Sequence, residues 1–588
     1  MSEKVSGSVF DLKLFGRLMR YVEKYRMQFI ISTVSVLLVA GFAAARPVLL
    51  KVIVNNYILN KNAQQLLYFS LIMLGVLVVE VIFQFLFSYL ANWLGQHVIK
   101  DLRTQIFERI LRFKMRYYTQ NPVGKLVTRV VSDIETIASI FSEGLFTIIS
   151  EILQMLVVML VMVWMNWRLA LIVFAVLPLI VYATKIFQIK IKSAFQEVRN
   201  QVANLNSFVQ ERLSGMMIVQ LFTREQTEYK KFQEINELHK KAYVRTVWYY
   251  SIFFPIAEIL SSVTLGIIVW YGGLKAAVDE AVLPGDIISF IMMSNMLFRP
   301  LRQIADKFNT LQMGMVAADR VFKILDEDAI EKDSGTVVAH DLKGNIQFDN
   351  VVFSYIEGEP VLKGISFDVK QGESIALVGA TGAGKSTIIN LLNRFYDIDS
   401  GKILIDGTNL KDFTLESLRD EISVVLQDVF LFSDSILNNI TLNNKSISLE
   451  EVEAAAKKIG IHDFIMSLPG GYDYNVKERG GMLSVGQRQL IAFLRAYVSK
   501  PAILVLDEAT SSIDAHSEEL IQKATETITE NRTSIIIAHR LATVKKASKI
   551  MVMDKGTIVE MGTHNELLEK KGVYSKLYEI QFAAHLIA

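Results

Sequence analysis

Residues 374–392 read SIALVGATGAGKSTIINLL, an apolar run, a loop with three glycines and a second apolar run. The loop fits the pattern GxxxxGK followed by Ser or Thr, with the strand before it and the helix after it that the pattern requires. In such a loop the glycines let the backbone wrap phosphates closely, Lys385 reaches the terminal phosphates and the Ser386 hydroxyl can ligate Mg²⁺. The stretch predicts a phosphate-binding loop whose contacting positions are Gly379, Ala380, Thr381, Gly382, Ala383, Gly384, Lys385, Ser386 and Thr387.

Strand-like runs alternate with helical stretches through the second half of the chain. The runs are IQFDNVVFSY (346–355), ISFDVK (365–370), SIALVG (374–379), GKILIDG (401–407), AILVLDE (502–508), SIIIAH (534–539) and KIMVMDKG (549–556). This alternation is typical of an α/β domain with a parallel core and some antiparallel additions. A polar, glycine-punctuated segment precedes it, so we expect a linker over 326–342 and the α/β domain over 343–588.

Two acids and a histidine stand at the ends of predicted strands. Asp507 and Glu508 close AILVLDE, and His539 closes TSIIIAH. In an open α/β sheet these strand ends form the ligand crevice. Asp507 would hold the Mg²⁺ shell, Glu508 would polarise the attacking water and His539 would lie near the terminal phosphate. The alternatives are that the acids only cap the next helix and that the histidine is a satisfied core residue.

A second candidate anion-binding turn lies further along the chain than the predicted phosphate-binding loop. The stretch RGGMLSVGQRQL (479–490) places glycines and one serine at the apparent start of a helix. Backbone N–H groups converge on negative charge at such a start, and the helix dipole supports them. The chain therefore carries two candidate phosphate sites.

The first half of the chain is apolar. Hydrophobic residues make up 51% of the whole sequence and charged residues 21%. Runs long enough to cross a bilayer, which takes about 20 residues, lie near 28–50, 66–95, 141–164, 167–187, 248–271 and 283–303. They show almost no polar stripe, which favours membrane spans over a soluble helical core. We predict an all-α membrane domain of six spans over 1–325, with long helical hairpins at 96–140 and 188–247.

Basic residues decide the predicted orientation. Lys and Arg gather in the connections between spans two and three and between spans four and five, which the positive-inside rule places in the cytoplasm. Six spans then leave both termini and the α/β domain in the cytoplasm, below the inner (plasma) membrane. No short apolar core leads to a small-residue cleavage site near the start, so we expect no cleaved signal peptide.

The net charge and the cysteine content argue against nucleic-acid binding, disulfides and thiolate metal sites. A formal net charge of +2 gives no reason to expect nucleic acid as a partner. Cysteine is absent, which excludes disulfides and thiolate metal sites.

The ordered motifs resemble the nucleotide-binding domain of an ATP-binding cassette (ABC) protein. GATGAGKST, LSVGQ, ILVLDE and His539 follow one another, and the spans ahead of them resemble a half-size ABC exporter of the bacterial multidrug and lipid-flippase type. The resemblance covers essentially the whole chain. It implies a RecA-like P-loop domain with antiparallel β and helical subdomains, ATP and Mg²⁺ as cofactors, and ATP hydrolysis that drives export or flipping of a hydrophobic or amphipathic substrate, drug-like or lipid.

The resemblance also assigns roles to single residues. Tyr355 would stack on adenine, and Gln427 would touch the Mg²⁺ shell together with Ser386 and Asp507. The alternative for Tyr355 is an ordinary aromatic residue of a strand. The alternative for Gln427 is a polar turn residue. Two further positions are assigned by the resemblance alone: Asp514, between the two ATP sites, and Glu478, at the cytoplasmic helices.

In this family two nucleotide-binding domains close face to face. Ser484, Gly486 and Gln487 would then contact the γ-phosphate held by the partner chain, in a homodimer or in a heterodimer with a related half-transporter. The hairpin turns, including NPVG at 121–124, would dock on the partner's nucleotide-binding domain. Val485 stands where the family usually has glycine, and this departure bears on rate and coupling more than on chemistry.

Several charged residues fall within or at the ends of the predicted spans. They are Arg46, Glu80, Glu143, Glu151 and Glu258. Such residues either line a substrate path or reach the headgroups from helix ends. The alternative to export is a membrane-anchored ABC ATPase with a regulatory role, for which the long spans would be excess machinery.

Overall fold

The computed structural model describes residues 11–278, 282–507, 515–538 and 541–579 of the chain. They form two compact units. The helical unit contains the residues up to Arg112 and Asn121–Asp328, and the α/β unit contains Phe113–Gln120 and the residues from Ala329 onward.

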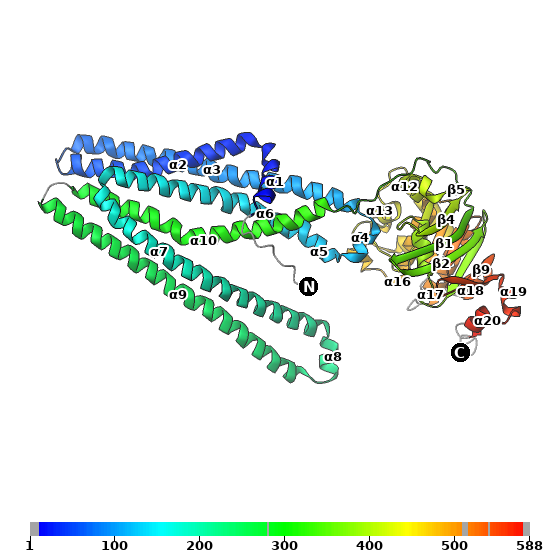
Figure 1. The fold of residues 1–588 in the computed structure, drawn as a ribbon. Coiled ribbons are helices and arrows are strands. Elements are labelled where there is room, and N and C mark those ends of the chain that lie inside the picture. The colour runs from blue at the N-terminus through cyan, green and yellow to red at the C-terminus, as the bar shows by residue number, and fades with distance from the viewer. Residues whose placement is uncertain (1–10, 279–281, 508–514, 539–540, 580–588) are drawn as a thin grey trace. The chain divides into compact units, whose positions relative to one another are not determined.

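Long helices build the helical unit (Figure 1). They are α1 (Leu12–Glu23), α2 (Arg26–Val52), α3 (Ala63–Leu111), α7 (Phe146–Ser214), α9 (Glu225–Val278) and α10 (Pro284–Asp326), with the shorter α5 (Val123–Thr128), α6 (Ile134–Ser139) and α8 (Met216–Leu221). The π-helical segments η1 (Ile53–Ile58), η2 (Arg129–Asp133) and η3 (Ile140–Leu145) lie between them. The predicted extension of the spans into long helices is confirmed, because α3 has 49 residues and α9 has 54.

Among the described residues, four stretches are long and apolar enough to cross a membrane: Arg26–Ile58, Ala63–Leu111, Val123–Ser214 and Glu225–Ala277. The third breaks at Asn166, whose φ of −160° and ψ of 102° are not helical. The Asn166 side chain accepts hydrogen bonds from the backbone N–H groups of Arg168 and Leu169, at 3.1 and 3.2 Å, and so starts a new helix. The break separates two predicted spans, 141–164 and 167–187. The sixth predicted span lies in α10, outside the four stretches, so the count of six stays a prediction.

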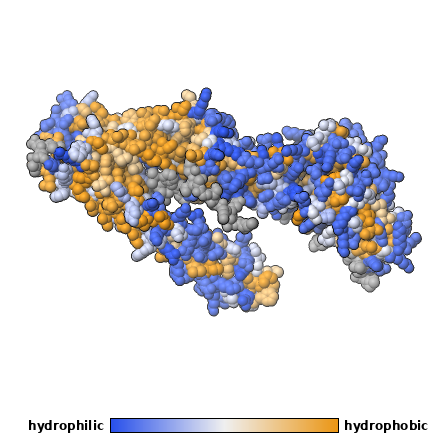
Figure 2. Space-filling model, in the orientation of Figure 1, coloured by the Kyte–Doolittle hydropathy of each residue, from blue (hydrophilic) through white to orange (hydrophobic). Residues whose placement is uncertain are grey.

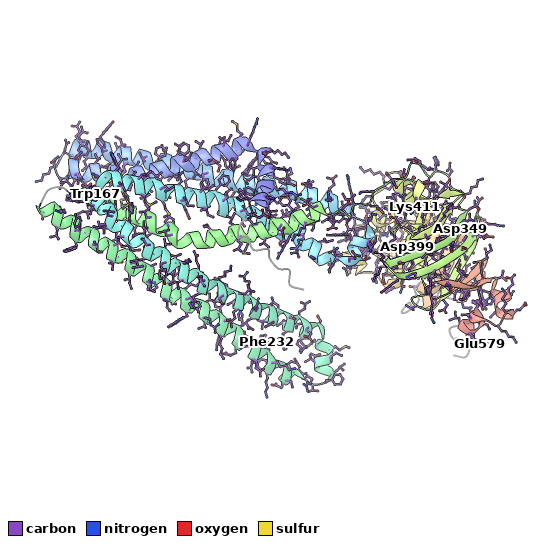
Figure 3. All side chains as sticks on the ribbon, in the orientation of Figure 1. Trp167, Phe232, Asp349, Asp399, Lys411 and Glu579 are labelled. Carbon is purple, nitrogen blue, oxygen red and sulfur yellow. The ribbon has the colours of Figure 1, made fainter. Side chains whose placement is uncertain are left out.

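The outer surface of the helical unit is apolar. Figure 2 shows hydrophobic residues gathered over α2 and α3. Leu71, Ile82 and Phe85 of α3 are 57%, 56% and 68% exposed. Exposed apolar area of this extent is typical of a lipid-facing surface. Trp167, labelled in Figure 3, is 59% exposed beside the break in α7, and an exposed tryptophan is typical of a membrane–water interface.

The hairpin of α7 and α9 ends in an apolar tip. Figure 2 shows this tip as a hydrophobic patch on an otherwise hydrophilic end, and α8 forms it. Met217, Leu221 and the following Phe222 are 70%, 67% and 70% exposed there. The long helices thus carry exposed apolar side chains on a turn rich in charged neighbours.

Two sheets build the α/β unit. The larger has the order β10-β9-β3-β8-β7-β6, and all of its neighbouring pairs are parallel except β10 with β9. The smaller is antiparallel, in the order β2-β1-β4-β5. The strands are β1 (Ile346–Ile356), β2 (Glu359–Val369), β3 (Ser374–Gly379), β4 (Ser400–Ile405), β5 (Thr408–Asn409), β6 (Ile422–Val425), β7 (Ile503–Asp507), β8 (Thr533–Ile537), β9 (Lys549–Asp554) and β10 (Thr557–Gly562).

The larger sheet is buried on both faces. On β3, Ala376 and Val378 belong to one apolar cluster, while Ile375 and Leu377 belong to another. The first cluster contains α14 (Leu449–Ile459), α16 (Val485–Val498) and α17 (Ala515–Thr529). The second contains α11 (Lys385–Leu392) and the smaller sheet. Strand side chains alternate between faces, so the two clusters cover opposite faces of one sheet.

The predicted fold class is confirmed: a helical membrane domain precedes an α/β domain with a parallel core and antiparallel additions. All seven predicted strands are present. The strands β5, β6 and β10 were not predicted, because β5 and β6 are only 2 and 4 residues long and β10 lies at the sheet edge. The other helices of this unit are α12 (Leu415–Asp420), α13 (Ile436–Thr441), α15 (His462–Ser467), α18 (Leu541–Lys546), α19 (His564–Glu569) and α20 (Val573–Tyr578).

A short piece of the first long hairpin, predicted over 96–140, belongs to the α/β unit. This piece contains α4 (Met115–Gln120). Phe113 pairs with Ile330 as an antiparallel bridge, and the Lys114 N–H donates to the Ala329 carbonyl at 2.8 Å. The expectation that the hairpin turns, including NPVG at 121–124, dock on a partner's domain stays a prediction, while α4, which precedes that turn, packs on its own chain. Backbone pairing, which has no local sequence signal, makes that contact.

Candidate nucleotide site

The phosphate loop links β3 to α11. Gly384, the N-cap residue of α11, has a φ of 103°, and a Cβ there would lie 2.7 Å from Leu362 Cδ2, so only glycine fits. Lys385 is buried, and its Nζ donates to the carbonyl oxygens of Gly379 and Ala380 at 2.7 and 3.0 Å. Its ammonium therefore stays within the loop, where phosphate oxygens would compete for its protons.

Burial lowers the pKa of the Lys385 ammonium, and the carboxylate of Asp507 acts in the opposite direction. The structure thus places the end of β7 within electrostatic reach of the phosphate loop. A bound phosphate would favour the charged ammonium further, because an opposite charge stabilises the charged form.

The carboxyl ends of the parallel strands meet at one sheet edge, as predicted. Leu377 of β3 is in register with Ile537 of β8, which is in register with Asp507 of β7. Gln427 follows β6 and is exposed. The exposed Ser386 hydroxyl, the Asp507 carboxylate and the Gln427 amide offer oxygen ligands, which fit Mg²⁺. The predicted residues Glu508, Asp514 and His539 lie outside the described residues.

Tyr355 of β1 is tied to the helix that follows the phosphate loop. Its hydroxyl accepts a hydrogen bond from Asn390 Nδ2 at 3.0 Å and lies 3.4 Å from Thr387 Oγ1. Phe353 and Tyr396 meet the Tyr355 ring edge-on, with centroids 4.8 and 5.0 Å away. These contacts fix the orientation of the ring beside the phosphate loop, where an adenine ring could stack on it.

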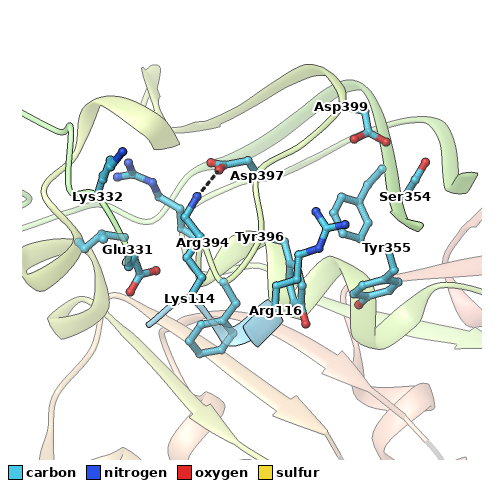
Figure 4. Close-up of a pocket in the computed structure, with 13 residues that line it drawn as sticks. Lys114, Arg116, Glu331, Lys332, Ser354, Tyr355, Arg394, Tyr396, Asp397 and Asp399 are labelled. Carbon is cyan, nitrogen blue, oxygen red and sulfur yellow. Dashed lines mark ion pairs between the residues drawn. The ribbon is translucent and has the colours of Figure 1, made fainter. Parts of the chain in front are cut away.

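A pocket of about 180 Å³ opens beside Tyr355 (Figure 4). Lys114 and Arg116 line it from the α4 segment, and Tyr396 and Asp397 line it from the loop after α11. Lys114 Nζ lies 3.8 Å from Asp397 Oδ2, and Figure 4 marks this pair with a dashed line. The segment that leaves the helical unit thus borders the same pocket as the predicted adenine-binding tyrosine. Sequence reasoning missed this pair, since neither residue belongs to a motif.

The second predicted anion site is a well-formed helix start. Ser484 caps α16 and forms a reciprocal capping box with Gln487. Gly486 is buried, while Val485 is 46% exposed beside the helix start. Helices α16 and α11 pack on opposite faces of the larger sheet.

Two of the charged residues of the predicted spans, Arg46 and Glu80, pair with each other within the helical unit. Arg46 Nη2 donates to Glu80 Oε1 at 3.0 Å, and Arg46 Nε lies 2.7 Å from Glu80 Oε2. Glu80 is only 7% exposed. Lys307 and Arg299 of α10 act electrostatically on Glu151 of α7. Glu258 borders a shallow groove on α9, and the side chain of Glu143 lies outside the described residues.

A second ion pair joins α2 to α10 and was not predicted. Lys51 Nζ lies 2.7 Å from Asp286 Oδ1, and Asp286 is 6% exposed. Asn55 accepts from the Gly285 N–H at 2.7 Å. The prolines at 47 and 284, next to these charges at span ends, were the only sequence signal that could have indicated them.

Comparison with known proteins supports one family. A model of the ABC transporter transmembrane region matches residues 29–301, and a model of the ABC transporter matches residues 362–511. The chain is 34% identical over 572 residues to the ATP-dependent lipid A-core flippase of Thiobacillus denitrificans, covering 97% of this chain and 98% of the relative. It is 34% identical over 585 residues to an uncharacterized ABC transporter ATP-binding protein, YknV, of Bacillus subtilis, covering 99% and 97%.

A solved bacterial Atm1-family ABC exporter with ATP bound has the same fold. Its TM-score is 0.75 at 28% sequence identity, covering 95% of this chain and 98% of that one. The order of the two units, the phosphate loop after β3 and the capped start of α16 agree with these similarities. The chain therefore belongs to the ABC transporter family and is a half-size, ATP-hydrolysing exporter that joins a multi-pass membrane domain to a nucleotide-binding domain.

Proposed function

We propose that two copies of this chain form the working exporter and hold two ATP molecules between their nucleotide-binding domains. The observation that supports the proposal is that α11 and α16, whose first residues form the two candidate phosphate-binding starts, pack on opposite faces of one sheet. In a face-to-face pair, Ser484 and the N–H groups of Gly486 and Gln487 would complete the γ-phosphate site of the partner. A second, identical chain is the simplest source of that surface.

Within each site we assign roles by position. The phosphate loop, from Gly379 to Thr387, would cradle the phosphates, and the Lys385 ammonium would exchange its two carbonyl contacts for phosphate oxygens. Tyr355 would stack on the adenine ring. Mg²⁺, held by Ser386, Gln427 and Asp507, would neutralise phosphate charge.

For hydrolysis, Glu508 would accept the proton of the attacking water, and His539 would orient groups at the γ-phosphate. Both follow strands whose ends lie at the same sheet edge, since Asp507 closes β7 and β8 ends at Ile537. Asp514 would lie between the two ATP sites. The released phosphate would then remove the charge that holds the domains together.

Export would follow from the domain closure. Closure would move the helical extensions, including the exposed apolar tip at α8, which we propose docks on the partner's nucleotide-binding domain.

We propose that both termini and both ATP sites lie in the cytoplasm, below the inner membrane, because the positive-inside rule places the long basic hairpins there. The lipid-facing surface of the helical unit and the flippase relatives support an amphipathic lipid or a drug-like molecule as the substrate class.

The test uses Glu508→Gln in the full chain reconstituted in lipid. We expect steady-state ATP hydrolysis to fall by about a thousandfold, as for loss of a group that acts only in the transition state, while ATP binding stays within about twofold. An unchanged hydrolysis rate would refute the assignment of Glu508.

Stoichiometry tests the dimer separately. The chain expressed alone should purify from detergent as a complex of about twice 66.5 kDa with ATPase activity. An inactive monomer that becomes active only with a second gene product would show that the partner is a different half-transporter.

A further inference from the structure

Side-chain contacts hold helix α1 against the C-terminal end of α10. The two terminal nitrogens of Arg17 donate to both carboxylate oxygens of Asp326, at 2.5 and 2.6 Å. The same guanidinium lies 4.2 Å from the centroid of the Phe322 ring, which is buried. Two hydrogen bonds and a cation–π contact therefore hold the middle of α1 to the last turns of α10.

Helix α1 is also fastened to α3. The Tyr21 hydroxyl donates to Gln105 Oε1 at 2.5 Å. Lys24 Nζ and the Tyr25 hydroxyl both donate to Asp101 Oδ2, at 2.9 and 3.0 Å. One short helix and the turn after it thus join two long helices that are far apart in the sequence, α3 and α10.

The fastened ends are the places where the chain leaves the helical unit. That unit ends at Arg112, one residue after α3, and again at Asp328, two residues after α10. Arg109 Nη2 donates to the Glu327 carbonyl at 3.0 Å and joins the two ends directly. The residues that α1 contacts therefore lie close to both points where the chain passes into the α/β unit.

The other side of α1 suits a charged lipid surface. From Leu12 to Met27 the sequence has five basic residues and one acid, Glu23, and two of the five, Arg17 and Lys24, pair with α10 and α3. Lys13 and Arg20 are exposed and lie outside the contacts to α3 and α10. Leu12 at the start of α1 and Met27 at the start of α2 are 74% and 69% exposed. A basic helix that also presents apolar side chains is typical of binding in the plane of a membrane interface.

The aromatic rings around the end of this helix are of the kind that is typical at the level of lipid headgroups. Tyr25 meets Trp93 and His97 of α3 edge-on, with ring centroids 5.5 and 5.4 Å apart. On α3 the apolar stretch ends near Trp93, and charged residues such as Asp101 follow. Such a cluster, where apolar gives way to charged sequence, marks a membrane–water interface. It lies at the junction of α1 with the first span.

We propose that the exposed face of α1 binds anionic phospholipid headgroups of the cytoplasmic leaflet and that the Arg17–Asp326 pair carries this binding to α10. The proposal rests on the orientation given under the proposed function. Headgroup charge attracts Lys13 and Arg20, and each contributes about fivefold in lipid affinity. Lipid binding would order α1 and, through Asp326 and Phe322, the end of α10 that leads into the nucleotide-binding domain.

Hydrogen exchange of the full chain in nanodiscs tests the proposal without requiring activity. The discs contain phosphatidylcholine alone or with phosphatidylglycerol. We expect phosphatidylglycerol to slow exchange severalfold in α1 and in residues 311–326 of the wild type. In Lys13→Gln/Arg20→Gln it should slow neither segment. The matched control, Lys570→Gln/Lys571→Gln, removes two exposed charges from the other unit and should behave as wild type.

Two further variants separate lipid binding from its transmission. Arg17→Ala and Asp326→Ala should keep the slowing in α1 and lose it in residues 311–326. The charge exchange Arg17→Asp/Asp326→Arg should restore it. The proposal is overturned if phosphatidylglycerol leaves wild-type exchange unchanged, or if Lys13→Gln/Arg20→Gln or Arg17→Ala retains the response of α10. If Glu508→Gln fails its test while these results hold, the proposed chemistry is wrong and the role of α1 stands.

Discussion

Ser484 and Gln487 bond to each other in both directions at the start of α16. The Ser484 Oγ accepts from the Gln487 backbone N–H at 3.2 Å, and the Ser484 N–H donates to Gln487 Oε1 at 2.9 Å. The cap uses the serine oxygen as an acceptor, so the hydroxyl proton can be donated to a phosphate oxygen. The Ser484 side chain can thus stabilise the helix and contact a nucleotide at the same time.

Replacing Ser484 separates these two roles, because α14 offers a matched cap. Ser448 and Glu451 form the same box. Ser484→Ala and Ser448→Ala should each cost about 1 kcal/mol of stability. Only Ser484→Ala should lower ATP hydrolysis, by about tenfold to a hundredfold, since a hydrogen bond to a charged group is worth about 1.5–3 kcal/mol. Equal activities of the two variants would remove the phosphate role from Ser484.

Val485 offers a way to raise nucleotide affinity. Its branched side chain is 46% exposed beside the amides of the helix start. Val485→Gly should let the partner's phosphate approach more closely and lower the KM for ATP severalfold, although glycine in a helix costs up to about 1 kcal/mol relative to alanine. Steady-state kinetics in lipid measure the effect. Val485→Ala, with a small side chain and better helix propensity, should give an intermediate KM, and an unchanged KM in both would contradict the prediction.

Lys385→Met keeps the apolar stem and removes the ammonium that burial and Asp507 act upon. We expect ATP affinity to fall at least about tenfold, as charged hydrogen bonds to phosphate are lost. Equilibrium binding of ATP to the purified chain measures it. Lys411→Met, an exposed lysine labelled in Figure 3, is the control and should bind ATP normally.

Two variants of Tyr355 separate the contribution of its ring to ATP binding from that of its hydroxyl. Tyr355→Ala should weaken ATP binding by roughly 5- to 100-fold, because stacking on a base is worth about 1–3 kcal/mol. Tyr355→Phe loses only the contacts with Asn390 and Thr387 and should bind within about threefold of the wild type. Equal losses in both variants would indicate that the hydroxyl, not the ring, holds the nucleotide.

The Arg46–Glu80 pair decides between a structural and a transport role for buried charge. Glu80→Leu leaves Arg46 unpaired and should cost about 3–5 kcal/mol of stability. Arg46→Leu/Glu80→Leu should recover most of it, seen as the unfolding temperature in detergent. If the double variant is stable and exports a substrate normally, the pair serves packing. If it is stable but inactive, the pair belongs to the substrate path.

The fold and the elements that carry the proposed nucleotide site could be predicted because their signals are local. The glycine loop at 379–384, the apolar strand before Asp507 and the serine at the start of α16 are short patterns whose backbone geometry neighbouring residues decide. The long apolar helices are equally local, since hydrogen bonding inside each helix satisfies its backbone. The short strand β6 and the pairing of Phe113 with Ile330 escaped prediction because they depend on distant partners.

Local patterns of residues are enough to predict the order of domains, the apolar helices and the chemical types at the phosphate loop. Three features became visible only in the folded chain: α11 and α16 use opposite faces of one sheet, Arg46 pairs with Glu80, and Arg17 joins α1 to Asp326. These contacts join residues that are tens to hundreds of positions apart. Their partners are selected by packing and charge in three dimensions, which no local pattern of residues encodes.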